Sequence, residues 1–434
     1  AQNRASWERR AQNEPAKLEA DVDMGQNLWV PLGAITAYNS TSSTFTESAT
    51  QGYTGEFDGQ GHVITGIRNG YLTGITRYGL FGTVGSGTVK NTFMDSYTNL
   101  AVNTGIYFMG GISGMTKGSA IISNCEARGA MDLTECVATS YAGGIVGRME
   151  SSSKVHSCMA MPEIIYQNTR AGGLAGQTYP GATIKNSYAN GMYTSVTNTV
   201  VGGLVGWNQG TVENCYSRLQ GAQPNNFGWF VGTNEGGVTM CYAPSGESKY
   251  INNPLSGTLT GHGNYGPTAL VNGKYGFAHQ DQDVALASGT NTYIENGPIN
   301  DQGELKGLLA TLNNWVAAQT DGVAYSTWTR TMASPINGDY PILEFNDFVC
   351  AGSTDNVFIA YKDDLNDMLD YANGNTTGGN IYLYRNTPSA VSQTTHDNVR
   401  VYIAPNVGLT QAVGNTLNAR VGVTLDNSDA GWLG

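Results

Sequence analysis

The sequence predicts an all-β protein: a right-handed parallel β-helix with short capping helices and a β-rich C-terminal segment. A glycine-marked phrase recurs along the chain and is clearest at 201–216, where Val-Gly-Gly-Leu-Val-Gly is followed by Val-Glu-Asn-Cys-Tyr. Copies are spaced by roughly 26 to 33 residues, a repeat length typical of solenoids. Each copy holds two short apolar runs without a helical period, which predicts strands. The second position of the phrase falls at Gly79, Gly111, Gly144, Gly173, Gly203 and Trp229.

Aligning the second apolar run of each copy gives columns, meaning residues at one position of successive repeats. A β-branched column is expected to face a shared interior: Val89, Ile122, Val155, Ile184, Val212 and Val238. A polar column of mixed charge follows and is expected to face solvent: Lys90, Ser123, His156, Lys185, Glu213 and Thr239. The next column predicts a ladder of asparagines at a corner, because Asn tolerates left-handed backbone geometry: Asn91, Asn124, Ser157, Asn186 and Asn214.

Two further columns come after the corner. One contains only small residues and is predicted to point inward: Thr92, Cys125, Cys158, Ser187, Cys215 and Cys241. The other is largely aromatic and is predicted to point outward: Phe93, Met159, Tyr188, Tyr216 and Tyr242. A rung of about 30 residues that returns to the same column closes a coil of roughly three strands, with like positions stacked about 4.8 Å apart. The right-handed sense is extended from the rule for parallel crossover connections.

These motifs resemble a known family. The phrase at 201–216 is similar to the GLUG repeat of bacterial surface proteins, especially those of the Bacteroidetes type. The resemblance extends over roughly residues 17 to 345 and includes a lead-in at 18–24, 29–33 and 57–64 and a closing Trp328 with 338–343. It implies a β-helix of the adhesin class, found in large surface proteins with mostly unknown ligands.

Four regions are expected along the chain. Residues 1–16 form an N-terminal arm or cap, 17–249 the parallel β-helix, 250–349 irregular closing coils with a short helix, and 350–434 a second β-rich module resembling the start of another β-helix. A Ser- and Thr-rich insertion at 38–51 is expected to be an exposed loop. Helical apolar spacing predicts helices near 301–315 and 361–374, and strands are predicted at 381–384, 399–403 and 420–425.

Composition argues for a secreted or outer-surface protein and against a nucleic-acid partner. The net charge is -12, only 13% of residues are charged, and Lys and Arg gather on no face. Abundant Gly, Thr, Ser, Asn and Tyr suit a turn-rich extracellular β-protein, and no run of 18 apolar residues is present to span a membrane. No signal peptide is recognised in the sequence, and its start is expected to be either a mature end left by a cleaved signal or the edge of a fragment of a longer protein.

No metal or cofactor site is expected from the cysteines. Four of the six share the small column and are interpreted as buried thiols, since parallel stacked side chains suit a disulfide poorly. A structural calcium ion is the one cofactor left open, either at Asp21 with Asp23 or at Asp281 with Asp283.

No catalytic residues are predicted. Polysaccharide lyases and hydrolases also use the β-helix, but they need clustered carboxylates on adjacent rungs, and the exposed polar column stacks none. The candidate ligand-binding residues are therefore aromatic: Tyr188, Tyr216, Tyr242, Trp207 and Trp229. The alternative for this column is that the rings only shield the sheet.

The sequence favours a non-enzymatic, adhesin-like surface protein that binds a glycan or a surface protein along the β-helix flank and through loops at 38–51 and 250–298. Two alternatives stay open. One is a polysaccharide lyase or hydrolase, and the other is a structural component of a surface layer or of a large cell-envelope assembly that contacts other chains.

Overall fold

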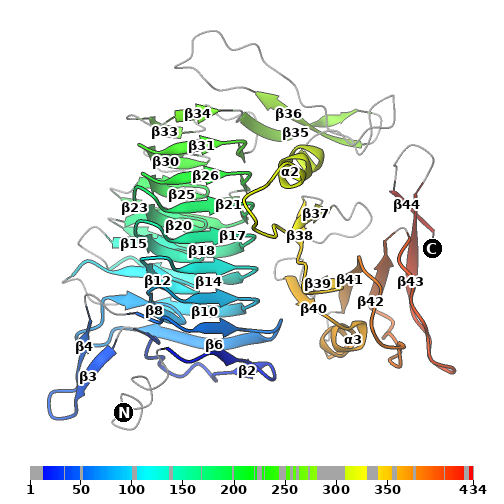
Figure 1. Ribbon diagram of the computed structural model, residues 1–434, viewed down its shortest axis with the longest axis horizontal. Helices are drawn as coiled ribbons and strands as arrows, with labels where there is room; N and C mark the ends of the chain where they lie inside the picture. Colours follow the sequence, from blue (N-terminus) through cyan, green and yellow to red (C-terminus); the bar gives the residue numbers. More distant parts are fainter. Residues whose placement is uncertain are drawn as a thin grey trace. The chain divides into compact units, whose positions relative to one another are not determined.

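A parallel β-solenoid forms the first part of the molecule (Figure 1). The computed structural model describes residues 13–243, 251–280, 308–329 and 341–433, apart from short gaps. The chain divides into two compact units, one containing the chain up to Tyr265 and the other the chain from Thr292 onward. The coil passes through four parallel sheets in the described residues, here called sheets I to IV.

Sheets I and II lie on either side of the predicted asparagine corner. Sheet I consists of β1 (Ala16–Lys17), β5 (Glu56–Asp58), β9 (Thr88–Lys90), β13 (Ile121–Ser123), β17 (Lys154–His156), β21 (Thr183–Lys185), β26 (Thr211–Glu213), β31 (Gly237–Thr239) and β34 (Thr258–Thr260). Sheet II consists of β2 (Val22–Asp23), β6 (Val63–Gly70), β10 (Phe93–Asn99), β14 (Glu126–Leu133), β18 (Met159–Gln167), β22 (Tyr188–Ala189), β23 (Met192–Thr197), β27 (Tyr216–Ser217), β28 (Gln220–Gly221), β32 (Tyr242–Ala243), β35 (Gly263–Val271) and β36 (Lys274–Gln280).

Sheets III and IV lie on either side of the glycine pair. Sheet III consists of β7 (Arg77–Tyr78), β11 (Phe108–Gly110), β15 (Ser140–Gly143), β19 (Thr169–Gly172), β24 (Val200–Gly202) and β29 (Phe227–Gly228). Sheet IV consists of β8 (Phe81–Val84), β12 (Ser113–Thr116), β16 (Val146–Met149), β20 (Ala175–Thr178), β25 (Val205–Asn208), β30 (Val231–Asn234) and β33 (Ile251–Pro254).

The prediction of roughly three strands per coil is wrong: each coil of the described repeats has four, because sheets III and IV are separate sheets. The glycine pair bends the chain sharply, so that one expected strand becomes two. A Cβ added to Gly144 would lie 2.4 Å from the Cβ of Ala160 and 2.3 Å from the carbonyl oxygen of Gly173. No side chain fits where successive coils approach this closely, which explains why the phrase is marked by glycine.

The predicted stacking of like residues is confirmed. Val155 is paired in parallel register with Ile122 on one side and with Ile184 on the other, and Ile184 is paired with Val212. All of them are at most 1% exposed and belong to one hydrophobic core cluster. Burying a side chain of this size stabilises the fold by about 1.5 to 3 kcal/mol, so each rung adds to a continuous core. The right-handed sense of the coil stays a prediction.

Two segments of the first unit differ from expectation. The insertion expected to be an exposed loop contains an antiparallel hairpin of β3 (Ile35–Asn39) and β4 (Thr44–Glu47). Past residue 250, where irregular coils were expected, β33, β34 and β35 stack in parallel on β30, β31 and β32. Main-chain hydrogen bonds join neighbouring coils, and so the solenoid extends beyond the recognisable repeat.

In its described residues from 308 onward, the second unit combines two helices with antiparallel and parallel strands. Its elements are α2 (Leu308–Ala317), β37 (Thr327–Thr329), β38 (Ile342–Glu344), β39 (Cys350–Ser353), β40 (Ile359–Lys362), α3 (Leu365–Asn373), β41 (Gly379–Leu383), β42 (Val399–Ile403), β43 (Ala419–Thr424) and β44 (Ala430–Leu433). Strands β41, β42 and β43 pair in parallel, whereas β39 joins β41 and β44 joins β43 in antiparallel pairs.

The helix predicted near 361–374 is confirmed as α3. Asp364 caps its N-terminus by accepting a hydrogen bond from the backbone N–H of Asn366 at 2.7 Å, and the helix ends at Gly374. Its apolar stripe, which includes Leu365 and Met368, is buried. Tyr361 belongs instead to strand β40. The other expected helix is α2, and residues 301–307, where it was predicted to begin, lie outside the described residues.

Candidate functional site

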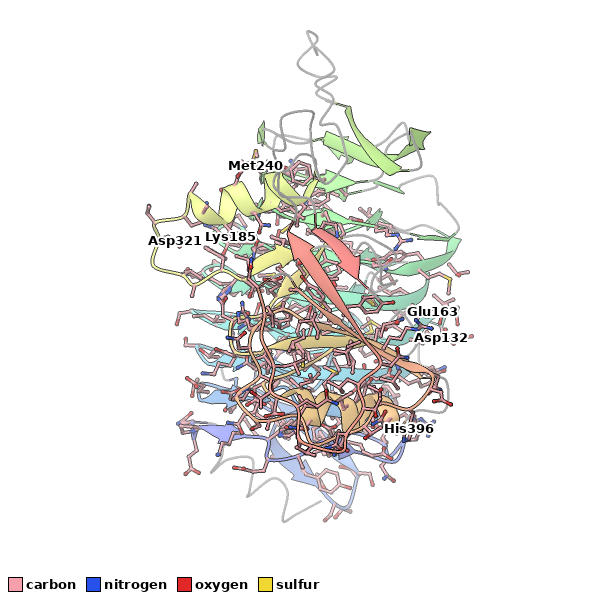
Figure 2. All side chains as sticks on the ribbon, turned by 90° about the vertical axis from the view of Figure 1, so that its right-hand side faces the viewer. Asp132, Glu163, Lys185, Met240, Asp321 and His396 are labelled. Atoms are coloured by element: carbon pink, nitrogen blue, oxygen red, sulfur yellow. The ribbon has the colours of Figure 1, made fainter. Side chains whose placement is uncertain are left out.

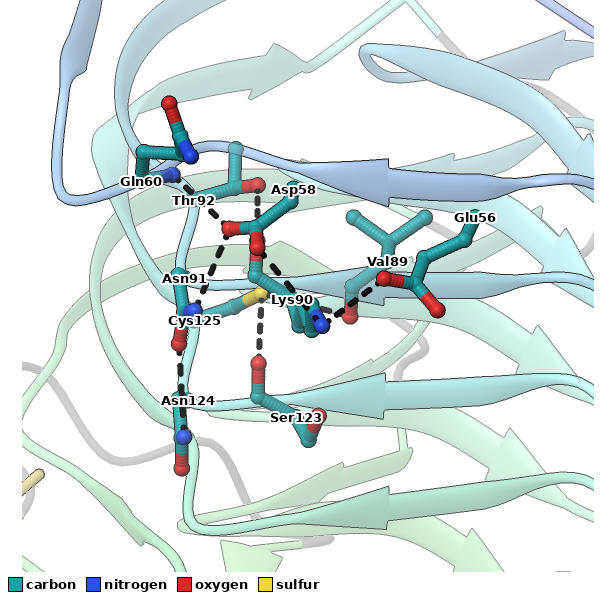
Figure 3. A network of polar contacts seen from close by, with 10 residues as sticks. All are labelled: Glu56, Asp58, Gln60, Val89, Lys90, Asn91, Thr92, Ser123, Asn124 and Cys125. Atoms are coloured by element: carbon teal, nitrogen blue, oxygen red, sulfur yellow. Dashed lines mark hydrogen bonds and ion pairs between the residues drawn. The ribbon is translucent and has the colours of Figure 1, made fainter. Parts of the chain in front are cut away.

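The corner between sheets I and II carries the asparagine ladder, as predicted (Figure 3). Asn91 Nδ2 donates to Asp58 Oδ1 at 3.1 Å, and Asn124 Nδ2 donates to Asn91 Oδ1 at 3.3 Å. Further along, Asn214 Nδ2 donates to Asn186 Oδ1 at 2.8 Å. These residues adopt φ near +50°, a left-handed geometry that Asn tolerates better than most side chains. The corner is therefore a structural hydrogen-bond chain.

The small column after the corner also has a structural role. Cys125 Sγ donates to the carbonyl oxygen of Ser123 at 3.1 Å, two residues back, and Ser187 Oγ donates in the same way to Lys185 at 2.7 Å. Each of these carbonyls also accepts a backbone N–H from the neighbouring rung, so the thiol or hydroxyl is a second donor to it. Cys, Ser and Thr all supply such a donor, which explains why these three residue types share the column. Burial raises the pKa of the Cys158 and Cys241 thiols, so they stay protonated. The four column cysteines are free thiols.

The polar column of sheet I forms ion pairs between neighbouring rungs. Lys90 Nζ lies 2.8 Å from Glu56 Oε1 and 3.6 Å from Asp58 Oδ2 (Figure 3). The hydrogen bond to Glu56 is the main cause that raises the pKa of Lys90. Lys185, labelled in Figure 2, pairs in the same way with Glu213 at 3.0 Å. Such partly exposed pairs add little stability, and their charges already balance one another.

The expected exposure of the aromatic column is wrong. Tyr188, Tyr216 and Tyr242 are each at most 1% exposed. The rings of Tyr188 and Tyr216 stack 4.8 Å apart with an interplanar angle of 6°, and the Tyr188 hydroxyl lies 2.8 Å from Met159 Sδ. Like aromatic residues in register cover one another's faces, so the column is a packed stack without an open ring face. Its proposed ligand role stays a prediction without an accessible surface to support it.

Trp207 lies in a different part of the solenoid, on the outward face where sheets III and IV meet. Strand pairing places side chains there in register: Phe108 with Tyr141, Tyr141 with Arg170, Arg148 with Gln177, and Gln177 with Trp207. We call the set formed by Phe108, Tyr141, Arg148, Arg170, Gln177, Tyr179 and Trp207 the arginine–aromatic flank. Most of these side chains are half-buried, whereas the residues next to Phe108 and Tyr141 along their strands, Met109 and Ala142, belong to the core. Trp229 lies outside the described residues.

Arg148 sits among three aromatic rings of the flank. Its guanidinium carbon lies 4.3 Å from the ring centroid of Tyr179, 5.3 Å from that of Phe108 and 6.0 Å from that of Tyr141. Phe108 and Tyr141 stack on each other with centroids 5.1 Å apart. Arg148 also forms a 2.6 Å ion pair with Glu150, so its charge is balanced.

Arg170 lies between two rings, one on each neighbouring rung. Its guanidinium carbon is 3.8 Å from the Trp207 ring and 5.3 Å from the Tyr141 ring. Its Nη1 donates to Gln177 Oε1 at 2.9 Å and to the Tyr141 hydroxyl at 3.3 Å. Burial lowers the pKa of Arg170, and nearby groups including Tyr141 and Glu235 act in the opposite direction. The side chain remains a cation because arginine titrates far above neutral pH.

A chain of amides extends the flank along the solenoid. Gln177 Nε2 donates to Gln209 Oε1 at 3.1 Å, and Gln209 Nε2 donates to Glu235 Oε2 at 2.8 Å. This chain fixes Gln177 and, through it, the orientation of Arg170. Two donors of the flank, Arg148 Nε and Trp207 Nε1, are buried without a hydrogen-bond partner among the described residues. Ring contacts therefore hold Trp207, and ring contacts together with the Glu150 ion pair hold Arg148.

Of the two acidic pairs considered for calcium, the structure describes only Asp21 with Asp23, and both of these side chains accept backbone hydrogen bonds. Asp21 Oδ1 accepts the backbone N–H of Val63 at 2.9 Å and lies 3.1 Å from His62 Nδ1, and Asp23 Oδ1 accepts the backbone N–H of Gly25 at 2.8 Å. Asp281 and Asp283 lie outside the described residues. In the part of the chain that is described, no three His, Cys, Asp or Glu side chains gather as a metal site would require.

Asp132 and Glu163 come from the neighbouring strands β14 and β18 and lie on the same side of the solenoid (Figure 2). Asp132 accepts hydrogen bonds from Asn99 and Thr134, while Glu163 is exposed. A sugar-cleaving enzyme on this scaffold needs two carboxylates on neighbouring rungs, and Asp132 with Glu163 is one such pair. Alignment of the repeats missed them because they lie outside the aligned columns.

The flank was missed for a similar reason, although a signal for it exists. Tyr141 lies three residues before the second glycine of its phrase and Arg148 four residues after it, and Arg170 and Gln177 occupy the same two places in the next copy. These positions vary between copies in size and charge, whereas the two positions of the glycine pair vary only at Tyr78 and Trp229. Positions on either side of the glycine pair that vary from copy to copy are therefore expected to point outward, because an inward position must fit the shared core.

The fold therefore defines a parallel β-solenoid that displays a half-buried arginine–aromatic surface. Comparison with family models finds the GLUG motif at residues 197–218. That segment contains β25 and contributes Trp207 to the flank. A search of curated proteins found no match. The helices that the structure describes are too short or too polar to cross a membrane.

Proposed function

We propose that this chain is a non-enzymatic, adhesin-like protein of a bacterial surface, secreted or held at the cell exterior, and that it binds a glycan through the arginine–aromatic flank. The observation that carries the proposal is the alternation of Arg148 and Arg170 with aromatic rings on successive rungs. Flat rings stack on the apolar faces of sugars, and tyrosine and tryptophan are favoured at recognition surfaces because they combine a large face with a polar group.

The scaffold suits recognition of an extended ligand. Each rung repeats the flank about 4.8 Å further along the solenoid, and parallel pairing fixes the backbone on both sides of Arg170. A surface that is ordered before binding loses little entropy when the ligand arrives. The chain also contains only 13% charged residues, with abundant Gly, Ser, Thr and Asn, which suits an extracellular repeat protein.

A glycan array with the purified chain tests the proposal. Trp207→Ala should weaken binding by about tenfold or more, because removing an aromatic anchor of a recognition surface typically costs at least that factor. The matched control is Tyr97→Ala, which truncates an aromatic side chain that is 37% exposed on strand β10, away from the flank. Equal binding by the wild type and the Trp207 variant would contradict a role for the flank.

The purified chain also allows the proposed function to be distinguished from its two alternatives. A polysaccharide lyase or hydrolase would release shorter sugars from a bound polymer, and Asp132→Asn together with Glu163→Gln would abolish that release. A structural component of an envelope assembly would bind no glycan and would instead associate with other chains. Sedimentation of the chain at several concentrations would detect self-association.

A further inference from the structure

We infer that the glycan recognised by the flank is acidic, carrying carboxylate or sulfate groups, and that Arg170 binds these groups. The inference rests on the proposed function, because it specifies the ligand class of the same surface. It comes from the uneven charge balance of the flank.

Arg170 is a half-buried cation without a direct ion pair among the described residues, and Glu235 acts on it only at longer range. Arg148, one rung away, has Glu150 at 2.6 Å. Among the described residues, Arg170 has no carboxylate oxygen within ion-pair distance, and its hydrogen-bond partners are the neutral Gln177 and Tyr141. Partly buried charges in proteins are normally paired, because removing them from water costs free energy that an opposite charge offsets. A flank built for a neutral sugar would not require a cation that lacks a direct ion pair.

The geometry of Arg170 suits an anion. The Trp207 ring at 3.8 Å fixes the plane of the guanidinium, and Gln177 fixes its rotation through Nη1. Within the described residues, Nε and Nη2 have no hydrogen-bond partner. These two atoms form one edge of the guanidinium, which is the edge that binds the two oxygens of a carboxylate or sulfate together.

The surroundings favour an acidic ligand over a neutral one. The chain carries a net charge of -12, so an acidic polymer is repelled from most of its surface. Lys117 adds a further cation on a neighbouring part of the solenoid; burial and nearby Arg77 lower its pKa, and Glu150 acts in the opposite direction. A local cluster of cations on an acidic protein selects both the ligand and its orientation.

Binding should be measured by calorimetry with three polymers of matched length: polygalacturonate, which bears carboxylates; heparin, which bears sulfates; and dextran, which is uncharged. We expect polygalacturonate or heparin to bind at least tenfold more tightly than dextran, and raising the salt concentration to weaken that binding. The stronger of the two acidic polymers identifies the group that Arg170 prefers.

Arg170→Gln should weaken binding of the acidic polymer by about tenfold or more, the usual consequence of losing a hydrogen bond to a charged group. Arg170→Lys should give an intermediate loss, because it keeps the charge without the planar fork. The matched control, Arg68→Gln, removes an exposed arginine on strand β6 and should leave binding unchanged. Circular dichroism establishes that each variant folds.

A second variant decides the matter even if the Arg170 variants fail to fold. Glu150→Gln removes the carboxylate that neutralises Arg148 and should tighten binding of the acidic polymer several-fold. Glu19→Gln changes the net charge equally at a distant, exposed ion pair with Lys17 and should have no such effect. Tight binding of dextran with the same affinity would overturn the inference but leave glycan binding intact. Failure to bind any glycan on the array or in solution would overturn both.

Discussion

The asparagine corner and the arginine–aromatic flank belong to the same coils but are built in opposite ways. At the corner, like side chains repeat and bond one another across rungs, as Asn214 bonds Asn186 at 2.8 Å and Asn186 bonds Ser157 at 3.3 Å. On the flank, unlike side chains follow one another, and Arg170 lies between Tyr141 and Trp207. A uniform column satisfies its own hydrogen bonds and closes the coil. In a varied column, neighbouring side chains do not use all of one another's hydrogen-bonding groups, and the remaining groups can bind a ligand.

The largest expected effect is on the uniform interior. Ile184→Ala should lower the free energy of unfolding by about 2 to 5 kcal/mol, because Ile184 is fully buried between Val155 and Val212 and its loss leaves a cavity. Urea denaturation followed by circular dichroism measures the change. A cost below about 1 kcal/mol would mean that the column does not form a packed core.

Substitution at the asparagine corner should lower the free energy of unfolding by nearly as much. Asn186→Ala should cost about 2 to 4 kcal/mol, because alanine disfavours the left-handed φ of 50° and the hydrogen bonds to Ser157 and Asn214 are lost. Asn186→Gly relieves the backbone strain and should cost less than the alanine variant, as compared by urea midpoints. If glycine proves as damaging as alanine, the side-chain ladder rather than backbone geometry dominates.

Alkaline pH should lower the free energy of unfolding through the buried thiols of the small column that follows the corner. Burial raises the pKa of the Cys158 and Cys241 thiols above their usual value of 9.0. Below pH 9 both states keep the proton and the full stability is present. Above pH 9 only the unfolded chain releases it, so the free energy of unfolding falls by up to about 1.4 kcal/mol per pH unit for each thiol.

Urea titrations between pH 8 and 10 test this expectation. The double variant Cys158→Ser with Cys241→Ser should flatten the pH dependence, and serine suits the column because Ser187 already occupies it. Thiol-reactive dye should label the native chain slowly and the denatured chain rapidly. Rapid labelling of the native chain would show that the cysteines are accessible.

The smallest expected change in stability is on the flank. Arg170→Gln should lower the free energy of unfolding by only about 1 kcal/mol, the size of a partly exposed cation–π contact, while its effect on ligand binding is large. Urea denaturation of this variant beside Ile184→Ala compares the two regions directly. If the two variants lose stability equally, the flank is structural and the contrast with the corner disappears.

The sequence predicted the features that depend on like residues being stacked. The β-branched column, the asparagine ladder and the small inward column need only the repeat length and the pleat of a strand, and all are present in the structure. It did not predict the four-strand coil, because the bend at Gly144 depends on how closely Ala160 and Gly173 of adjoining strands approach it. Contacts between residues far apart in the chain decide such bends.

The amino-acid sequence by itself determined the solenoid and its register, because a one-residue slip would move Val155 and Ile184 from the interior to the surface. Only the tertiary structure decided which outward columns are open. Tyr216 looks like a binding residue in the alignment, yet it is buried, whereas Arg170 and Trp207 belong to separate copies of the phrase and meet only when the coils stack. Exposure and charge balance are properties of neighbours in space, and a column of residues in one chain does not specify those neighbours.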